Sequence, residues 1–282
     1  MQLRQKIIPF LAVISGLLLF TYPFFSNYLY EKSAGSSIEG YQKKTLQTSK
    51  NKIQSAWKKA KIYNQELAVS KAQLTDPFQA TQIQNLKYTS ILNADPSGIM
   101  GYIDIPCISV KLPIYHGTSA EVLEKGVGHL VATSFPVGGK NTHAVLTAHT
   151  GLSSAKLFTD LTEMKKDDVF FLHVLDRTLA YKVDQISVVQ PEDTTKLQIV
   201  DGKDYVTLVT CTPYGVNSHR LFVRGIRTAY HEEQEKHIPA RKHSSQWMKT
   251  YQKAMILGLL ILLIVEMVRR GIQKIQKKRI NL

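Results

Sequence analysis

A cysteine and an arginine lie at the adjoining ends of two short apolar runs. Cys211 ends the first run, and Arg220 begins the second nine positions later, after a segment that contains Pro, Gly and Asn. Turn-forming residues between two apolar runs predict two antiparallel strands joined by a loop. Such a hairpin would bring the thiol and the guanidinium together at one end of a sheet. Because a neighbouring cation favours the reactive thiolate, the pair indicates a nucleophilic site.

A nucleophilic thiol in acyl transfer needs a partner that moves protons and a group that stabilises an oxyanion. His149 follows the apolar run 144–148 and precedes a glycine, so we expect it where a strand ends and a loop begins. Loops held by a rigid scaffold often carry catalytic groups. Arg220 is the candidate for the oxyanion, and its alternative is Arg224, which lies on the same face of the predicted strand.

The other histidines do not form a recognisable metal site. His143 lies six positions before His149, and no third ligand is close to the two in the sequence. A zinc site needs three or four suitably spaced ligands. We therefore predict no metal and no cofactor. The remaining histidines are expected to be structural or to lie on the surface: His116, His129, His173, His219, His231, His237 and His243.

The residues around the cysteine resemble the signature of a known family. The run Thr207–Cys211 followed by Arg220 is similar to the motif of sortases, the cysteine transpeptidases of Gram-positive cell surfaces. Thr212–Gly215, together with Asn217, most resembles the pilin-polymerising subgroup, class C. The resemblance extends from about Gly98 to Arg227 and implies a closed sortase-type β-barrel.

The resemblance also implies roles for three residues. His149 matches the sortase histidine within the motif Ala148–Leu152, although Thr150 stands where class C members often have arginine. In the reaction that the resemblance implies, Cys211 attacks the Thr carbonyl of an LPxTG-like sorting signal. His149 protonates the departing glycine amine, and Arg220 stabilises the tetrahedral intermediate.

For class C the resemblance implies that a lysine of another pilin resolves the thioacyl enzyme, so that subunits with LPxTG-like motifs form covalent pili. Two alternatives stay open. The chain could instead anchor surface proteins to peptidoglycan, with a cell-wall amine as the nucleophile. It could also be a non-catalytic ectodomain that scaffolds pilins, although the intact trio of His149, Cys211 and Arg220 argues against this.

A short segment far upstream of the cysteine resembles the lid of class C sortases. Asp76-Pro77-Phe78 is similar to the motif in which Asp pairs with the catalytic Arg and an aromatic residue covers the Cys. An ordinary Asp-Pro turn is the competing interpretation, because Asp95-Pro96 repeats the dipeptide. A lid over the site would shield the thiol from water and oxidation.

The composition is ordinary for a globular protein, with 21% charged and 44% hydrophobic residues among 282. A formal charge of +14 would fit a nucleic-acid partner, but six of the cations crowd into 269–279, directly after an apolar run. Basic residues beside an apolar run are typical of a cytoplasmic membrane flank. We therefore predict a membrane partner and no nucleic acid.

Two apolar runs are expected to meet the membrane. Residues 1–27 predict an N-terminal anchor or signal, with a cleaved signal peptide as the alternative to an uncleaved anchor. Residues 251–269 predict a C-terminal transmembrane helix, followed by a basic cytoplasmic tail over 270–282. Because the outer flanks of both runs are basic, both termini are expected in the cytoplasm and the catalytic domain outside the cell.

The segments between these runs predict a mostly β fold. Helix-compatible apolar spacing in 28–97 indicates N-terminal helices that carry the lid, and short strands with turn signals across 98–230 indicate a closed barrel with short helices. The polar segment 231–250 is expected to be a stalk. Cys107 lies among apolar neighbours, so we expect it to be structural and not to pair with Cys211.

Overall fold

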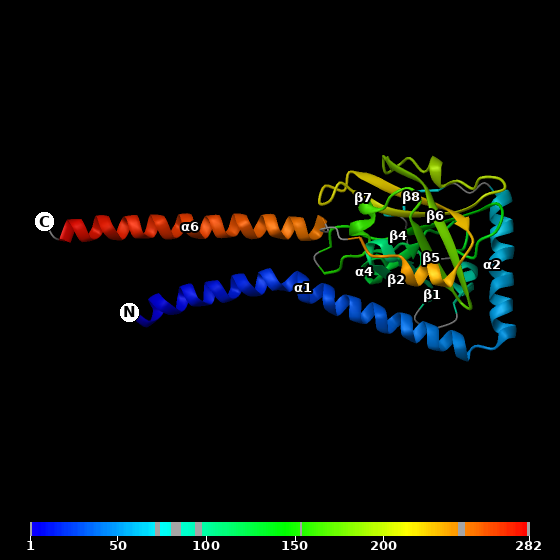
Figure 1. The fold of residues 1–282 in the computed structure, drawn as a ribbon, viewed down its shortest axis with the longest axis horizontal. Helices are drawn as coiled ribbons and strands as arrows, with labels where there is room; N and C mark the ends of the chain where they lie inside the picture. Colours follow the sequence, from blue (N-terminus) through cyan, green and yellow to red (C-terminus); the bar gives the residue numbers. More distant parts are fainter. Residues whose placement is uncertain are drawn as a thin grey trace. The chain divides into compact units, whose positions relative to one another are not determined.

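The computed structural model describes residues 2–70, 74–79, 86–93, 98–152, 154–241 and 246–280. The chain forms two compact units, one made of Met1–Tyr22 with Ser244–Leu282 and the other of Pro23–His243. The second unit contains the β-barrel (Figure 1).

The barrel is closed and has the strand order β1-β2-β3-β4-β7-β8-β6-β5. Closure occurs because β5 pairs with β1, which leaves no unpaired sheet edge. Most neighbours are antiparallel, whereas β2–β3 and β4–β7 are parallel. This confirms the predicted barrel. The strands are β1 Ile99–Ile105, β2 Val110–His116, β3 Val127–His129, β4 Thr142–Thr147, β5 Val169–Val174, β6 Arg177–Val189, β7 Asp204–Thr212 and β8 His219–Thr228.

Alternation along the strands sends one set of side chains into the barrel and the other set outward. In β7, Val206 and Leu208 belong to the main interior core, whereas Val209 belongs to a separate apolar cluster. Gly225 in β8 permits a close approach inside the barrel, since a Cβ there would lie 2.6 Å from Cε1 of Phe170. The residues of β7 and β8 that face outward are therefore the ones available for a site.

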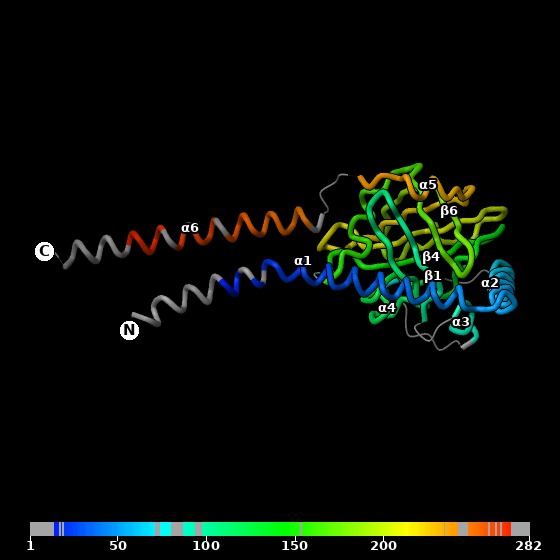
Figure 2. The backbone as a smooth tube through the Cα atoms, turned by 60° about the horizontal axis from the view of Figure 1, so that its bottom comes forward, coloured from blue at the N-terminus to red at the C-terminus, as the bar shows by residue number. Residues whose placement is uncertain are grey.

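Helices before the barrel lie against it. The second unit contains part of α1 Gln2–Gln47 together with α2 Lys50–Ser70 and α3 Leu86–Ser90 (Figure 2). The Tyr41 hydroxyl donates to the Met100 carbonyl at 3.0 Å, and Trp57 Nε1 donates to Asp176 at 2.9 Å. These contacts place α1 and α2 on the barrel wall, and the lid segment lies between α2 and α3 along the chain. The short helices within the barrel domain are η1 Pro106–Ile108, α4 Ala120–Lys125, η2 Thr159–Glu163 and η3 Thr195–Leu197.

The chain after β8 returns to the barrel before it reaches α6 Gln246–Ile280. Within 231–250, for which the sequence predicts a stalk, the short helix α5 Glu232–His237 is followed by contacts with the barrel. Ile238 packs against a cluster that includes Phe171, and Arg241 forms an ion pair with Asp168. We call residues 230–241 the strap.

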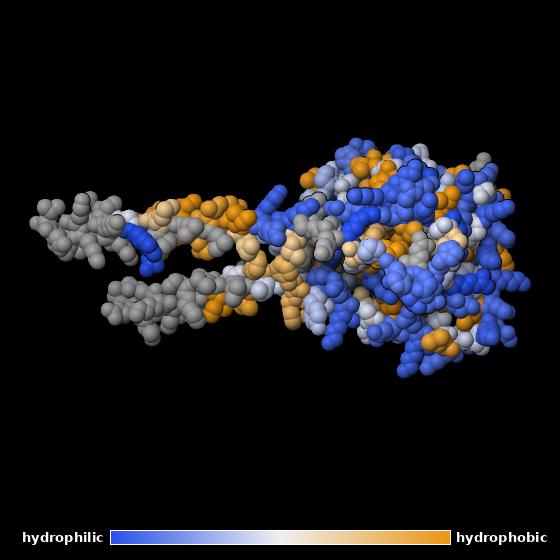
Figure 3. Space-filling view, in the orientation of Figure 1, coloured by the Kyte–Doolittle hydropathy of each residue, from blue (hydrophilic) through white to orange (hydrophobic). Residues whose placement is uncertain are grey.

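Among the described residues, one helix is long and apolar enough to span a membrane. It covers Met248–Gly271 within α6 and has a mean hydropathy of 1.9. Figure 3 shows apolar residues along the described part of this helix. The described residues thus contain one such helix, where the sequence predicted two flanking spans. The N-terminal apolar run lies in α1, where the side chains of residues 1–13 are outside the described ones, so its role as an anchor stays a prediction.

Candidate active site

Cys211 and Arg220 lie directly opposite each other in the antiparallel pair of β7 and β8. Opposite residues in such a pair share one face of the sheet, with Cβ atoms about 4.5–5.5 Å apart. That face is the outward one, because Val209 and Phe222, two positions from each residue, lie in the outer apolar cluster. Both Cys211 and Arg220 are 8% exposed. The predicted hairpin therefore places the thiol beside the guanidinium.

The alternative arginine has a different partner. Arg224 is on the same face of β8 but pairs in register with Thr207, four positions before Cys211. Its Nε and Nη2 donate to the carboxylate of Asp184 at 3.0 and 2.7 Å, and its guanidinium stacks over Tyr205. Arg224 is thus engaged in an ion pair of its own, and Arg220 is the cation beside the thiol.

His149 follows β4, and the residue before it is bonded to β7. The Ala148 N–H donates to the Val209 carbonyl at 3.2 Å, and the Thr210 hydroxyl donates to the Ala148 carbonyl at 2.8 Å. The second bond is buried and joins the neighbour of His149 to the neighbour of Cys211. The imidazole and the thiol are therefore carried by backbone segments that two hydrogen bonds hold side by side.

The segment predicted as a lid contacts both the arginine and the histidine. Asp76 is 4% exposed and accepts from Nε and Nη2 of Arg220 at 2.9 and 2.6 Å. The Phe78 ring lies 5.6 Å from the His149 ring, and the Arg220 guanidinium lies 5.0 Å from the Phe78 ring centre. The turn 76–79 closes on itself, with the Gln79 N–H donating to the Asp76 carbonyl at 2.9 Å.

Apolar contacts hold this segment on the barrel. Leu74 and Phe78 pack against the outer apolar cluster of six buried residues. Because a buried apolar side chain is stabilised in proportion to the area removed from water, this contact supports the closed position together with the ion pair. The cluster consists of Leu130, Val145, Val189, Leu197, Val209 and Phe222.

Burial keeps the thiol protonated. Loss of hydration raises the pKa of Cys211; Arg220 opposes this rise, whereas the negative charge of Asp76 adds to it. Burial also lowers the pKa of His149, against the smaller opposite effect of Glu124. For Arg220, burial acts to lower the pKa, but the hydrogen bonds to Asp76 and the charges of Cys211, Asp76 and Glu192 together raise it. In the closed arrangement the charge of Arg220 is shared with Asp76 and favours the thiolate less.

Two contacts that position the site were missed in the sequence analysis. Arg220 Nη1 donates to the carbonyls of Asn217 and His219 at 3.1 and 3.2 Å, which fixes the plane of the guanidinium. Asn217 has a φ of 60°, a left-handed conformation that asparagine tolerates better than most residues. The other missed contact is the bond from Thr210 to Ala148. An inward-facing threonine next to the cysteine was the available signal for it.

The second cysteine lies apart from this site. Cys107 is a buried free thiol in η1, and Cys211 is also free, so the two are not paired. Burial, with the nearby charge of Asp168, raises the pKa of Cys107 to about 12. The Cys107 carbonyl accepts a hydrogen bond from the Arg241 N–H at 2.9 Å, so this position contacts the strap.

Comparison with known proteins places the fold in a family. The model of the sortase domain matches residues 103–228. A solved sortase C from Streptococcus pneumoniae is 44% identical, with a TM-score of 0.64 over 69% of this chain and 97% of that one. The chain belongs to the sortase family. It is a sortase-type cysteine transpeptidase by that membership.

Other sortases match over similar lengths. Sortase C-1 of Actinomyces oris is 48% identical, with a TM-score of 0.61 over 64% of this chain and 99% of that one. A Sortase A of Bacillus anthracis is 28% identical over 224 residues, which are 78% of this chain and 92% of that protein. The solved structures compared are class C sortases, which agrees with the resemblance of the lid and of the residues after Cys211.

Proposed function

We propose that this sortase joins pilin subunits into covalent pili. Cys211 would cleave an LPxTG-like sorting signal after its Thr and hold the acyl group as a thioester, and a pilin lysine would then take it over. The likeness to sortase C supports this substrate class, since the structure of the S. pneumoniae protein bears on pilin substrate specificity. The observation that carries the proposal is the Asp76–Arg220 ion pair beside Cys211.

In the first half-reaction, the Cys211 thiolate attacks the Thr carbonyl carbon and forms a C–S bond. The carbonyl oxygen becomes an oxyanion, to which the Arg220 guanidinium donates. The C–N bond to glycine then breaks, and His149 supplies the proton that the leaving amine takes up. The products are a thioester on Cys211 and a free amino end on the departing peptide.

In the second half-reaction, a lysine amine of another pilin attacks the thioester carbonyl. His149, now neutral, accepts the proton that the amine loses. The C–S bond breaks, the thiolate returns to Cys211, and an isopeptide bond joins the two subunits. The site thus ends in the protonation state in which it began.

The lid would keep the site closed until a sorting signal arrives. The two donors of Arg220 that a substrate oxyanion would use are engaged by the Asp76 carboxylate. A substrate must therefore displace Asp76, and it gains the freed guanidinium when it does. Phe78, next to the His149 ring, would leave with the same segment.

The proposal includes the position of the enzyme in the membrane. With Met248–Gly271 as a span, the basic tail beyond it would lie in the cytoplasm and the barrel outside the cell. Residues 1–27 would add an N-terminal anchor or signal with the same orientation. Reporter fusions near Ser37 and Leu282 are expected to give outside and inside signals, and the reverse pattern would contradict this topology.

Polymerisation is tested with the purified full-length chain in detergent. It is mixed with a pilin that carries both an LPxTG-like motif and the acceptor lysine, and the products are separated on denaturing gels. We expect a ladder of covalent multimers that a Lys-to-Arg change in the pilin abolishes. Transfer to a peptidoglycan-type amine without a ladder would support the wall-anchoring alternative. If neither product forms and the LPxTG-like motif of the pilin stays uncleaved, the result would support a non-catalytic scaffold.

A further inference from the structure

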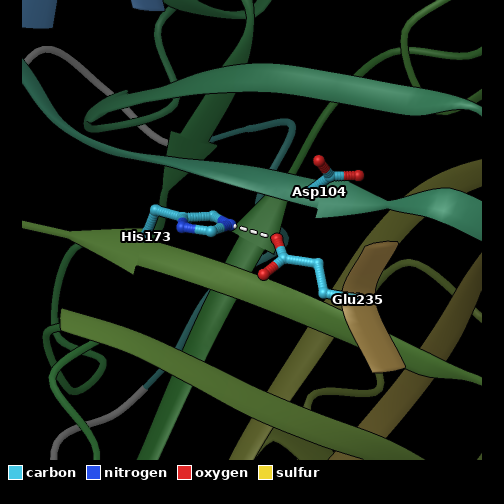
Figure 4. Close-up of side chains that lie close together, drawn as sticks. All are labelled: Asp104, His173 and Glu235. Carbon is cyan, nitrogen blue, oxygen red and sulfur yellow. Dashed lines mark hydrogen bonds and ion pairs between the residues drawn. The ribbon is translucent and has the colours of Figure 1, made fainter. Parts of the chain in front are cut away.

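Three metal-ligating side chains converge on the barrel at the strap, apart from the candidate active site. Asp104 comes from β1, His173 from β5 and Glu235 from α5, and their nearest ligand atoms all lie within 4.8 Å of one another. Figure 4 shows the His173 ring pointing at the Glu235 carboxylate, with the Asp104 carboxylate beside them. All three side chains are partly buried, with exposed fractions of 18%, 16% and 15%.

Contacts behind these side chains fix their orientation. The His173 ring stacks on Tyr102, its partner across β1 and β5, with centres 4.3 Å apart and an angle of 8°. Its Nδ1 lies 3.0 Å from the Thr178 hydroxyl, so Nε2 is the nitrogen that faces the cluster. The Tyr230 hydroxyl donates to the second oxygen of Glu235 at 2.7 Å. Hydrogen bonds of this kind behind the ligands are typical of metal sites.

The cluster brings two carboxylates to one imidazole. Asp104 and Glu235 both lie beside the His173 ring, and Lys111 is the cation next to Asp104. The ammonium of Lys111 lies 3.3 Å from Asp104, but its side chain is 52% exposed and can turn into solvent. An ion pair this exposed contributes little stability. A divalent cation would compensate the two carboxylates more fully than this one lysine does.

We propose that Asp104, His173 and Glu235 bind a divalent transition-metal ion, for which Zn²⁺ is the probe. Nε2 of His173 and one oxygen from each carboxylate would be the protein ligands, with water in the fourth position. An imidazole with two carboxylates suits Zn²⁺ better than Ca²⁺ or Mg²⁺, which prefer oxygen ligands alone. Ligands about 2.0–2.1 Å from a tetrahedral ion lie roughly 3.3 Å apart, so the side chains must close in slightly.

Binding also moves one proton. Nε2 of His173 now lies 2.7 Å from Oε1 of Glu235 and carries the hydrogen of that bond. A metal ion at Nε2 replaces this proton. In a neutral ring the proton moves through solvent to Nδ1 with no net release, and the Nδ1–H then donates to Thr178, whose hydroxyl can donate or accept. The ring can therefore become a ligand without rotating.

The expected consequence is a firmer attachment of the strap to the barrel. Two ligands belong to neighbouring strands, whereas Glu235 belongs to the strap that connects the barrel to α6 along the chain. A metal ion would tie the three elements together at one point. Zn²⁺ should accordingly slow proteolysis within the strap.

The test is calorimetric titration of the untagged full-length chain in detergent with Zn²⁺. We expect one site, with affinity weakened at least about tenfold by Asp104→Asn and by Glu235→Gln. These substitutions keep the side-chain size, and thermal unfolding without metal checks that the variants fold. Glu232→Gln and His237→Gln alter exposed residues of the same helix as controls and should leave the affinity unchanged.

A variant that is expected to bind Zn²⁺ more tightly completes the test. Lys111→Gln removes the cation that competes for Asp104, so it should tighten Zn²⁺ binding several-fold. Ca²⁺ and Mg²⁺ should not compete at equal concentration. The proposal is overturned by the absence of Zn²⁺ binding, or by equal affinities of the wild-type chain and the Asp104→Asn and Glu235→Gln variants. Weaker binding by Lys111→Gln would contradict Asp104 as a ligand.

Discussion

Asp76 and Arg220, 144 positions apart in the chain, form a buried ion pair in which both carboxylate oxygens accept from the guanidinium, at 2.9 and 2.6 Å. Arg220 is also the residue opposite Cys211 in the β7–β8 pair. Asp76 in the lid therefore influences the Cys211 thiol by compensating the charge of Arg220.

Asp76→Ala should make Cys211 more reactive. With the carboxylate gone, the charge of Arg220 is no longer compensated and favours the thiolate, so the Cys211 pKa should fall. The measurement is the rate of alkylation by a thiol reagent as a function of pH, with the midpoint expected at lower pH than in the wild-type chain. An unchanged midpoint and rate would mean that Asp76 has no influence on the thiol.

Phe78→Ala separates access from charge. The ring contacts His149 and Arg220 but carries no charge, so its loss should speed alkylation at every pH with little displacement of the midpoint. The comparison with Asp76→Ala is informative because both changes affect the same turn. Identical pH profiles for the two variants would show that the lid acts by steric cover alone.

Arg220 should be required for turnover in a way that Arg224 is not. Arg220→Lys should lower kcat about a hundredfold to a thousandfold, the usual cost of losing an oxyanion donor. A lysine cannot replace the arginine because it lacks the forked donors. Arg224→Lys is the matched control, since Arg224 pairs with Asp184. Steady-state cleavage of an LPxTG-like peptide measures both, and equal losses for Arg220→Lys and Arg224→Lys would exclude a special role for Arg220.

The pH dependence of kcat/KM should be a broad bell. The active form needs the Cys211 thiolate and the His149 imidazolium, so the rate falls below the lower pKa and above the higher one. Burial places the pKa of His149 below its ordinary 6.5 and that of Cys211 above its ordinary 9.0. The acid limb should therefore lie below pH 6.5 and the alkaline limb above pH 9.0.

Two variants assign the limbs of this bell. Asp76→Ala should move the alkaline limb to lower pH, since Asp76 raises the pKa of the thiol. Glu124→Gln should move the acid limb to lower pH, since Glu124 raises the pKa of His149. A wild-type alkaline limb below pH 9.0, or a Glu124→Gln profile that changes only on the alkaline side, would contradict the assignment.

Thr210 is expected to act as a positioning residue. Thr210→Val removes the buried hydroxyl that donates to the Ala148 carbonyl, at a cost of about 1–3 kcal/mol in the free energy of unfolding. Turnover should fall as well, because the backbone before His149 loses its tie to β7. Thr207→Val, which removes a hydroxyl 2.7 Å from His143 in the same strand, should lower stability without lowering turnover. Equal turnover in the two variants would count against positioning by Thr210.

Local patterns predicted the strands and the part of the site that depends on them. The apolar runs around Cys211 and Arg220, with turn residues between them, specify a hairpin, and a hairpin fixes which residues face each other. The position of His149 at the end of β4 is equally local. That β4 lies beside β7 depends on barrel closure, and no pattern of residues near His149 reveals it.

Contacts between distant segments were beyond the reach of local patterns. Asp76 could be matched to the site only through the resemblance of its motif, because an Asp-Pro turn carries no information about a partner 144 positions away. The strap contacts have the same origin: Glu235 meets His173 across 62 positions, and the polar composition of the segment indicated only a stalk. Both contacts depend on how a closed barrel presents its outer face.

A thioester between Cys211 and the sorting signal can be observed by intact-mass analysis of the full-length chain shortly after mixing with an LPxTG-like peptide. We expect a mass gain equal to the peptide up to its Thr, mapped to Cys211, removed by hydroxylamine and absent in Cys211→Ala. Release of the glycine fragment without an adduct on Cys211, or an unaltered rate of release in Cys211→Ala, would contradict this expectation.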